Sequence, residues 1–275
     1  METLTAAILP QTIRQRPADS HKGTYGRIVL IGGNDNFGGA IIMASAAAVY
    51  SGAGLVTTVT AKSNQTSLHD RVPEAIFADI TDVSLMVSLI TAADTIVIGP
   101  GLGTTNQSRA TLTTAFENIQ ADQRVIIDGS AITLVATDQL SLPTAHLIFT
   151  PHQMEWQRLS GIAIADQTPQ RNRQVVDELH GIVVLKSHHT EIYTATETYR
   201  NPLGTPAQAT GGMGDTLAGM VGGFVAQFAN ESQAVLAAVY SHSAIAEELA
   251  TSQYVVLPHQ IITEIPRFMK THSEK

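Results

Sequence analysis

One stretch of the chain sets three glycines and an aspartate directly before a helical pattern: Ala209-Thr210-Gly211-Gly212-Met213-Gly214-Asp215-Thr216-Leu217. After it, apolar residues recur at the spacing of one helix face, at Met220, Val221, Phe224, Val225 and Phe228. The glycines are therefore expected at the beginning of a helix. There the first backbone N–H groups have no partner within the helix, and the helix dipole adds positive potential.

This arrangement predicts an anion cradle with a base beside it. Glycine lets a phosphate approach the free backbone amides of Gly212, Met213 and Gly214, which side chains would block. Asp215 is placed to take a proton from a hydroxyl that attacks the bound phosphate. The alternative is a glycine turn in which Asp215 is an ordinary helix cap.

The composition of the chain excludes several kinds of site and of binding surface. The chain has 275 residues, a hydrophobic content of 44% and only 5% aromatic residues, which is typical of an aliphatic core between helices and a buried sheet. It has no cysteine, so disulfides and thiolate metal ligands are excluded. The net charge of −8 argues against a broad nucleic-acid surface.

The beginning of the chain and its apolar runs predict a soluble, cytoplasmic protein with no membrane partner. The first ten residues lack a basic flank followed by an apolar core, so no export signal is expected. The apolar runs are too short, and too rich in alanine and serine, to span a bilayer.

Short β-branched runs alternate with helical patterns, which predicts an α/β fold with a mostly parallel central sheet flanked by helices. We expect one domain over residues 1–275, because no repeat or linker divides the chain. The expected strands are 27–31, 55–59, 95–98, 125–127, 147–149 and 182–185, followed by a hairpin of 191–196 with 198–200. The expected helices are 40–50, 83–90, 108–118, 169–180, 215–229, 232–250 and one that begins near Pro258.

Two glycine clusters follow predicted strands. Residues 32–40 read Gly-Gly-Asn-Asp-Asn-Phe-Gly-Gly-Ala, and residues 99–103 read Gly-Pro-Gly-Leu-Gly. Parallel sheets bind ligands beyond the carboxyl ends of their strands, so both clusters should reach one cleft. The first suits a loop against a flat ligand, but it lacks the G-x-G-x-x-G spacing, and a capped surface loop is the alternative.

Three polar clusters also follow predicted strands. His152 and Glu155 are a candidate substrate contact and a candidate metal or water holder, or else a satisfied polar group and the N3 residue of a helix cap. Lys186 is a natural partner for phosphate, or a solvated strand end. His188 and His189 are not expected to bind metal, because neighbours on extended chain point in opposite directions. Asp128 could face the cleft, and His242 is expected to be a packed or capping histidine.

In this order, the clusters resemble the ADP-dependent NAD(P)H-hydrate dehydratases of the ribokinase-like superfamily. The resemblance extends from about Lys22 to Ala250. It is carried by Lys22-Gly23, residues 32–40, Pro73-Glu74, residues 99–103, 150–155 and 184–190, and the stretch 209–218. It implies a three-layer ribokinase-like sandwich and repair of a damaged metabolite. Hydrated NADH or NADPH would be dehydrated while ADP is converted to AMP and phosphate, a lyase reaction.

The resemblance also implies roles for residues. Asp215 would be the base, and the amides of Gly212, Met213 and Gly214 would receive the transferring phosphoryl group. Hydrated dinucleotide would contact Ala40, Gly103, His152 and Asp215, with no room for a side chain at Gly103. The AMP part of the nucleotide would be lined by Lys186, Ser187, His188, His189, Thr190 and Gly214.

The resemblance further implies Mg²⁺, although the sequence shows no dedicated metal ligands and Glu155 is only a candidate outer-shell group. It implies a separate epimerase for the hydrate epimers and a homotetramer. Asp128-Gly129-Ser130 stands where the family more often has Asp-Ala-Asp, and Ser187 replaces the usual glycine after the lysine. Two alternatives remain: an ATP-dependent kinase of a small alcohol or vitamin precursor, and a nucleotide-binding sensor without catalysis.

Overall fold

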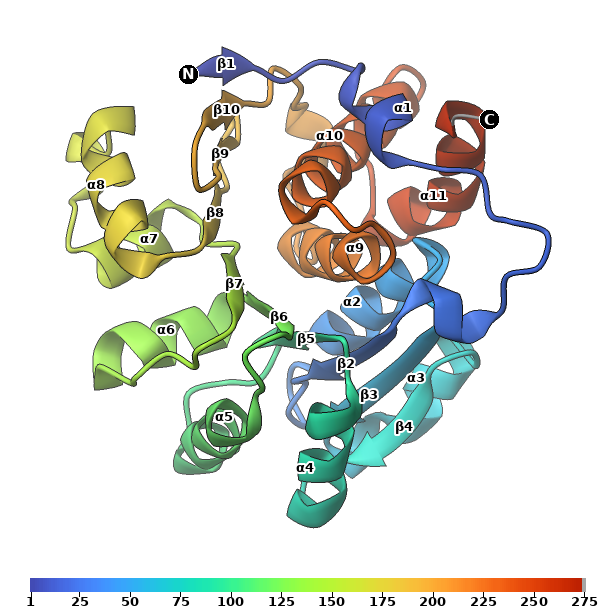
Figure 1. The fold of residues 1–275 in the computed structure, drawn as a ribbon, viewed down its shortest axis with the longest axis vertical. Coiled ribbons are helices and arrows are strands. Elements are labelled where there is room, and N and C mark those ends of the chain that lie inside the picture. Colours follow the sequence, from blue (N-terminus) through green and yellow to red (C-terminus); the bar gives the residue numbers. More distant parts are fainter. Residues whose placement is uncertain (274–275) are drawn as a thin grey trace.

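The computed structural model describes residues 1–273, in which ten strands form one mostly parallel sheet (Figure 1). The strands are β1 (Glu2–Thr3), β2 (Arg27–Ile31), β3 (Leu55–Thr60), β4 (Ile76–Asp79), β5 (Thr95–Ile98), β6 (Arg124–Ile127), β7 (His146–Phe149), β8 (Ile182–Leu185), β9 (Glu191–Tyr193) and β10 (Thr198–Arg200). Their order across the sheet is β1-β10-β9-β8-β7-β6-β5-β2-β3-β4. The strands from β8 through β4 run parallel, whereas β9 is antiparallel to both of its neighbours.

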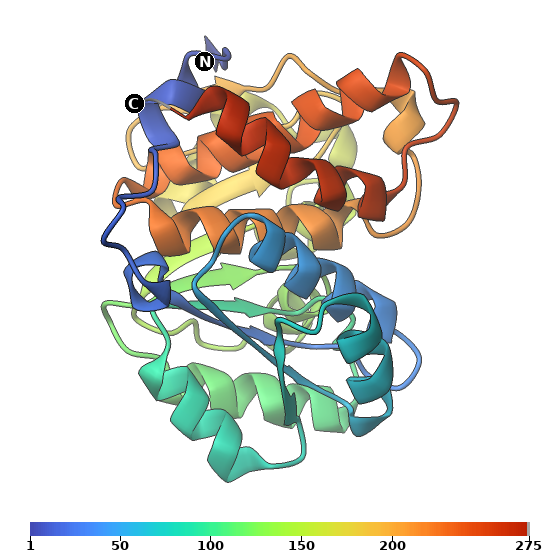
Figure 2. The same cartoon turned by 90° about the vertical axis from the view of Figure 1, so that its right-hand side faces the viewer.

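Helices cover both faces of this sheet, so the three-layer α/β fold is confirmed. The helices are α1 (Ile8–Thr12), α2 (Gly38–Tyr50), α3 (Gln65–Arg71), α4 (Val83–Ala92), α5 (Asn106–Asn118), α6 (Gly129–Asp138), α7 (Gln153–Ser160), α8 (Pro169–Leu179), α9 (Met213–Gln227), α10 (Glu231–Ala250) and α11 (Pro258–His272), with short 3-10 turns η1 (Lys22–Tyr25), η2 (Lys62–Asn64), η3 (Ile164–Asp166) and η4 (Pro206–Gln208). Figure 2 shows α10 and α11 stacked outside α9 and α2 on one face, with the helices of the other face below the sheet.

Alternate residues of each central strand serve two separate cores. Ile28 and Leu30 of β2 pack with α2 and α9, whereas Val29 and Ile31 pack with α4 and α5 on the other face. Strands buried on both faces are mostly apolar on both sides, and β3 adds buried threonines such as Thr58 and Thr60 to its apolar residues. Because of this burial, these strands could be predicted from the sequence.

Helices α2 and α9 approach each other closely through small residues. A Cβ at Gly219 would lie 2.1 Å from the carbonyl oxygen of Ala44, and one at Gly223 would lie 3.0 Å from that of Ala48. Only glycine permits such backbone contact. Both helices begin at the carboxyl edge of the sheet, so this contact fixes the two helix beginnings relative to each other.

Most expected elements are present, with strand ends within one residue and helix ends within two. The hairpin differs, because β9 ends at Tyr193 instead of residue 196. There the chain turns: the Thr194 amide donates to the Glu197 carbonyl at 2.9 Å, and the Glu197 amide donates to the Thr194 hydroxyl at 3.1 Å. Strands β1 and β4 and helices α1, α3 and α6 were not expected, and α7 was raised only as the capping alternative for Glu155. Within residues 1–273, no helix is long and apolar enough to cross a membrane.

Candidate active site

Five loops meet at the carboxyl edge of the sheet because they follow five neighbouring strands, β2, β5, β6, β7 and β8. The two glycine clusters lie side by side. The Gly33 amide donates to the Pro100 carbonyl at 2.9 Å, and the Asn34 amide donates to the Gly101 carbonyl at 2.8 Å. They lie at β2 and β5, where the strand order reverses, which is the usual ligand site of an open parallel sheet.

Gly103 and Ala40 lie close to this junction. Gly103 has a φ of +81°, its amide donates to the Ser130 hydroxyl at 3.0 Å, and a Cβ there would lie 2.5 Å from the Asn34 side-chain nitrogen. A side chain is therefore excluded by the protein itself. Ala40 lies in the first turn of α2, beside the second glycine cluster. A Cβ at Gly101 would lie 3.0 Å from the Cβ of Ala40.

The glycine-rich stretch ahead of α9 forms an open helix beginning. The N-cap is Gly212, with a φ of +94° and no side-chain cap. A Cβ at Gly211 would meet nothing within 4 Å, whereas one at Gly212 would lie 2.5 Å from the Met43 side chain, so the helix beginning is open on the Gly211 side. A Cβ at Gly214 would lie 3.1 Å from Lys186 Nζ, which places the ammonium group beside the first turn of the helix. A cation and free amides together suit a phosphate.

Asp215 is the third helical residue of α9, and the N-cap position belongs to Gly212. The alternative that Asp215 is an ordinary cap is therefore wrong. Burial is the main cause that raises the pKa of Asp215; together with the charges of Asp128 and Glu155, and opposed by Lys186, it gives a pKa of about 6. A carboxylate with this pKa can accept a proton near neutral pH.

Lys186 and Asp128 form a buried ion pair that the sequence did not predict. Lys186 Nζ lies 2.9 Å from Asp128 Oδ1, which also accepts a 2.6 Å hydrogen bond from the Thr150 hydroxyl. Burial alone would lower the pKa of Lys186, but the charges of Asp128, Glu155 and Asp215 reverse this and raise it. Lys186 is therefore a permanent cation held over the beginning of α9, and not a solvated strand end.

His152 and Glu155 form a capping box at the beginning of α7. Nδ1 of His152 accepts hydrogen bonds from the Met154 and Glu155 amides, both at 3.1 Å, and Glu155 Oε2 accepts one from the His152 amide at 2.8 Å. The capping alternative is thus confirmed for Glu155, which is buried. The His152 imidazole is about half exposed, at 53% of its side-chain surface, and its Nε2 lies 3.5 Å from Glu155 Oε1.

The loop from Lys186 to Thr190 turns sharply between β8 and β9. The rings of His188 and His189 lie against each other, with centroids 4.1 Å apart and planes tilted by 40°, so the expectation that they point in opposite directions is wrong. The reason is the turn, in which the Ser187 hydroxyl donates to the His189 carbonyl at 2.7 Å. In the part of the chain that the structure describes, no group of three or more His, Cys, Asp or Glu side chains could hold a metal ion.

Two segments that contribute to the resemblance lie away from this site. Lys22 and Gly23 belong to η1, whose neighbour Gly26 packs against Ala226 near the far end of α9. Pro73 and Glu74 are exposed between α3 and β4. Their place in the resemblance therefore does not come from contact with the anion cradle.

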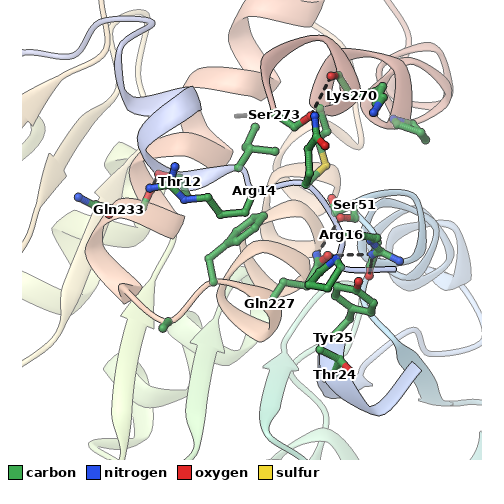
Figure 3. A pocket seen from close by; sticks show the side chains of 18 of the residues that line it. Thr12, Arg14, Arg16, Thr24, Tyr25, Ser51, Gln227, Gln233, Lys270 and Ser273 are labelled. Carbon is green, nitrogen blue, oxygen red and sulfur yellow. Dashed lines mark hydrogen bonds between the residues drawn. The ribbon is translucent and has the colours of Figure 1, made fainter. Parts of the chain in front are cut away.

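A cavity of about 1010 Å³ also lies far from the cradle, at the carboxyl ends of α2 and α9 (Figure 3). Arg16 donates from its guanidinium to the Gly52 carbonyl and to Gln227 Oε1, and it stacks on Tyr25 at 3.7 Å from the ring centroid. Arg16 thus donates to a backbone carbonyl oxygen just after α2 and to the side-chain oxygen of the last residue of α9. Since α9 has 15 residues, about 22 Å of helix separates this cavity from the cradle.

Comparison with known proteins identifies the family. The family described as NAD(P)H-hydrate dehydratase matches residues 28–267. The ADP-dependent (S)-NAD(P)H-hydrate dehydratase of Lactiplantibacillus plantarum is 57% identical over 274 residues, covering 100% of this chain and 99% of that protein.

Solved structures of similar proteins indicate the same family. A ribokinase-like superfamily protein from Enterococcus faecalis V583 has a TM-score of 0.98 and 45% identity, covering 100% of this chain and 97% of the other. The ADP/ATP-dependent NAD(P)H-hydrate dehydratase of Bacillus subtilis, co-crystallised with ATP/Mg²⁺, has a TM-score of 0.89 and 30% identity over 99% of both chains. With its ribokinase-like fold, this chain belongs to the NAD(P)H-hydrate dehydratase family.

Proposed function

We propose that the protein is an ADP-dependent (S)-NAD(P)H-hydrate dehydratase, which returns hydrated NADH or NADPH to the normal dinucleotide and converts ADP to AMP and phosphate. The observation that carries this is the pairing of Asp215, with its pKa raised to about 6, with the open beginning of α9 beside Lys186. Family membership supplies the substrate class.

The chemistry explains why a dehydratase would use a phosphate cradle. Hydroxide is a poor leaving group from C6 of the hydrated ring. Asp215 would take the proton of that hydroxyl as its oxygen attacks the β-phosphorus of ADP, and AMP would leave. The C6–O bond then breaks with release of phosphate, and loss of a proton from the neighbouring ring carbon restores the double bond.

The free amides of Gly212, Met213 and Gly214 would stabilise the charge on the transferring phosphoryl group, because backbone amides at an uncapped helix beginning attract negative charge. Lys186 would add a positive charge whose position is fixed by Asp128. Hydrated dinucleotide would lie against Ala40 and Gly103, with the half-exposed imidazole of His152 beside it.

The AMP part of the nucleotide would lie against Lys186, Ser187, His188, His189 and Thr190, next to Gly214. Lys186 supports this placement, since it belongs both to this loop and to the surroundings of the cradle. We infer that the adjacent imidazoles of His188 and His189 form part of the wall of the nucleotide site.

Magnesium would enter with the phosphates of the nucleotide. The carboxylates near the cradle already have partners: Asp128 serves Lys186 and Thr150, and Glu155 caps α7. The described residues do not form a metal site of their own. Mg²⁺ would therefore neutralise phosphate charge, and no step of the mechanism depends on a protein ligand to it.

Three further features are also part of the proposal. We propose that the protein works in the cytoplasm, that it forms a homotetramer, and that a separate epimerase supplies the reactive epimer of the hydrate. Sedimentation of the purified protein tests the tetramer. Adding an epimerase to a mixture of hydrate epimers should convert a reaction that stops partway into one that goes to completion.

The activity is tested by incubating the protein with hydrated NADH, Mg²⁺ and either ADP or ATP, while the absorbance of the dihydronicotinamide ring is followed. We expect that absorbance to return, and faster with ADP than with ATP. A protein that uses only ATP and accumulates a stable phosphorylated alcohol would instead be the small-molecule kinase. Nucleotide binding without any turnover would indicate the sensor.

A further inference from the structure

A second cavity at the carboxyl edge of the sheet has no role in the mechanism above. It measures about 580 Å³, which is within the size range of small-molecule sites. Segments 34–36, 61–63 and 79–81, at the carboxyl ends of β2, β3 and β4, form its wall together with the first turns of α5. The cavity therefore lies on the same edge of the sheet as the loops of the proposed active site.

The cavity adjoins Gly103 through the side chain of Asn34. Asn34 lines the cavity, and its side-chain nitrogen lies 3.4 Å from the Leu102 carbonyl oxygen and 2.5 Å from the place of a Cβ at Gly103. Leu102, the residue before Gly103, lines the cavity as well. The cavity thus begins beside a residue that is proposed to contact hydrated dinucleotide.

The position of the cavity fits the length of this substrate. Asp128, which holds Lys186 at the cradle, follows β6, and the strand order places β6 three positions from β3. Three spacings between neighbouring strands amount to about 14 Å. A small alcohol at the cradle does not reach so far. A dinucleotide does, because a pyrophosphate and two riboses separate its reacting ring from its adenine.

Two accessible carboxylates border the cavity. Asp35 Oδ1 accepts a 2.6 Å hydrogen bond from the Ser63 hydroxyl, and Asp79 Oδ1 accepts bonds from the Thr81 amide and hydroxyl at 2.9 and 2.7 Å. Among the described residues, Oδ2 of each carboxylate accepts no hydrogen bond, which leaves it for a ligand. The bonds from Thr81, aided by the charge of Lys62, lower the pKa of Asp79, so this carboxyl group is ionised at neutral pH.

Carboxylates suit ribose hydroxyl groups and repel a phosphate. In dinucleotide sites an acidic side chain accepts a hydrogen bond from the ribose 2′-OH of NAD, whereas an arginine accommodates the 2′-phosphate of NADP. Among the described residues that line this cavity, Lys62 is the one cation, and none is an arginine. Because Asp35 and Asp79 outnumber Lys62, the charge balance favours a ribose with free hydroxyl groups.

We propose that this cavity receives the adenosine half of hydrated dinucleotide, and that Asp35 and Asp79 make the site prefer hydrated NADH over hydrated NADPH. The proposal rests on the proposed function, which places the hydrated ring at Asp215. It assigns one surface both to the half of the substrate that does not react and to the choice between the two dinucleotides.

Binding of the product dinucleotides tests the preference without turnover. NADH and NADPH are titrated into the protein while the fluorescence of the reduced nicotinamide ring is followed. We expect NADH to bind about tenfold more tightly, as for one unfavourable contact between like charges. The double variant Asp35→Asn, Asp79→Asn keeps both Oδ1 acceptors and removes the charges, so NADPH binding should strengthen until the two affinities agree within about threefold.

A charge control and a steric pair sharpen the test. Asp122→Asn removes a carboxylate from the exposed turn before β6, at the opposite edge of the sheet, and should leave the ratio unchanged. Gln107→Trp, in the first turn of α5, puts a ring into the cavity and should weaken NADH binding at least about tenfold while ADP binding persists. Glu117→Trp, near the other end of the same helix, should change neither affinity.

Three results would overturn the proposal. Equal or tighter binding of NADPH by the wild type would show that Lys62 and the beginning of α5 decide the charge balance. Unchanged NADH binding in folded Gln107→Trp would place the adenosine half elsewhere. If neither product binds measurably, kcat/KM for the two hydrates replaces the titration, and equal values contradict the preference. Loss of the hydrate assay with NADH binding intact would instead remove the proposed function and leave the binding site standing.

Discussion

The two ends of α9 differ in their chemistry and in the size of the cavity beside them. The end that carries the titratable groups is not the end that borders the large cavity. At its beginning, Gly212 leaves the amides uncapped, and Asp215 has a raised pKa near a buried Lys186–Asp128 pair. At its carboxyl end lies the cavity of about 1010 Å³, where Arg16 is held by neutral acceptors and a tyrosine ring. Unsatisfied amides and a shifted pKa mark the proposed reactive end, whereas a large cavity volume alone does not indicate a reactive site.

The strongest test of this contrast is Asp215→Asn. We expect kcat to fall by about 10²–10⁴, because the amide cannot accept the hydroxyl proton. ADP binding should persist. A raised carboxyl pKa lowers stability as pH rises from about 4 through 6, so the Asn variant should be at least as stable as the wild type at pH 7, by a margin that shrinks toward pH 4.

Single-turnover rates, calorimetry with ADP and thermal melts together check that prediction. A folded variant that keeps more than about a tenth of wild-type kcat would remove Asp215 from the role of base. Loss of ADP binding would instead show that the carboxylate shapes the cradle.

The pH dependence of the reaction is the second test. Only ionised Asp215 can act as a base, and its pKa is about 6, so kcat/KM for the hydrate at saturating ADP should rise with pH and level off above about 7. The value at pH 5.5 should be about fourfold below the plateau. Initial rates from pH 5.5 to 8 measure the profile. A flat profile across that range would mean that a different group limits the reaction.

The smallest effect is expected at the other end of α9. Arg16→Met removes hydrogen bonds to the Gly52 carbonyl and Gln227 but leaves the cradle untouched. Since Arg16 is exposed, the loss should be about 1 kcal/mol of stability, or about 2 °C in Tm, with kcat and KM unchanged. Thermal melts and steady-state rates test this; a changed kcat would show that the two ends are coupled.

Local patterns predicted the frame of the site. Glycine and polar clusters after buried strands must lie at one edge of a parallel sheet, so Gly103, Lys186 and the stretch before α9 were found from the sequence. The partners of those residues were not found. Lys186 and Asp128 are 58 residues apart, and Gln208 and His242 are 34 apart. No helical or strand period encodes such pairs, because the order of strands and the packing of α10 bring them together.

Some local structure was also missed for a physical reason. Helix α6 begins directly after Asp128, at Gly129 with a φ of +53°. In the sequence this glycine indicated only the end of the strand, so the helix that follows was not predicted. Short elements such as α3 and β4 have too few residues to show a period.

The glycine contact between α2 and α9 gives the reaction a fixed spacing that does not depend on side-chain motion. One helix begins at the proposed dinucleotide loop and the other at the cradle, and between them Gly219 touches the backbone of Ala44 with no rotamer to change. The distance from hydroxyl to phosphorus would then be set when the chain folds and not when ligands arrive. Thermal agitation of surface loops can slow the entry of either ligand while leaving the alignment of the reacting atoms intact.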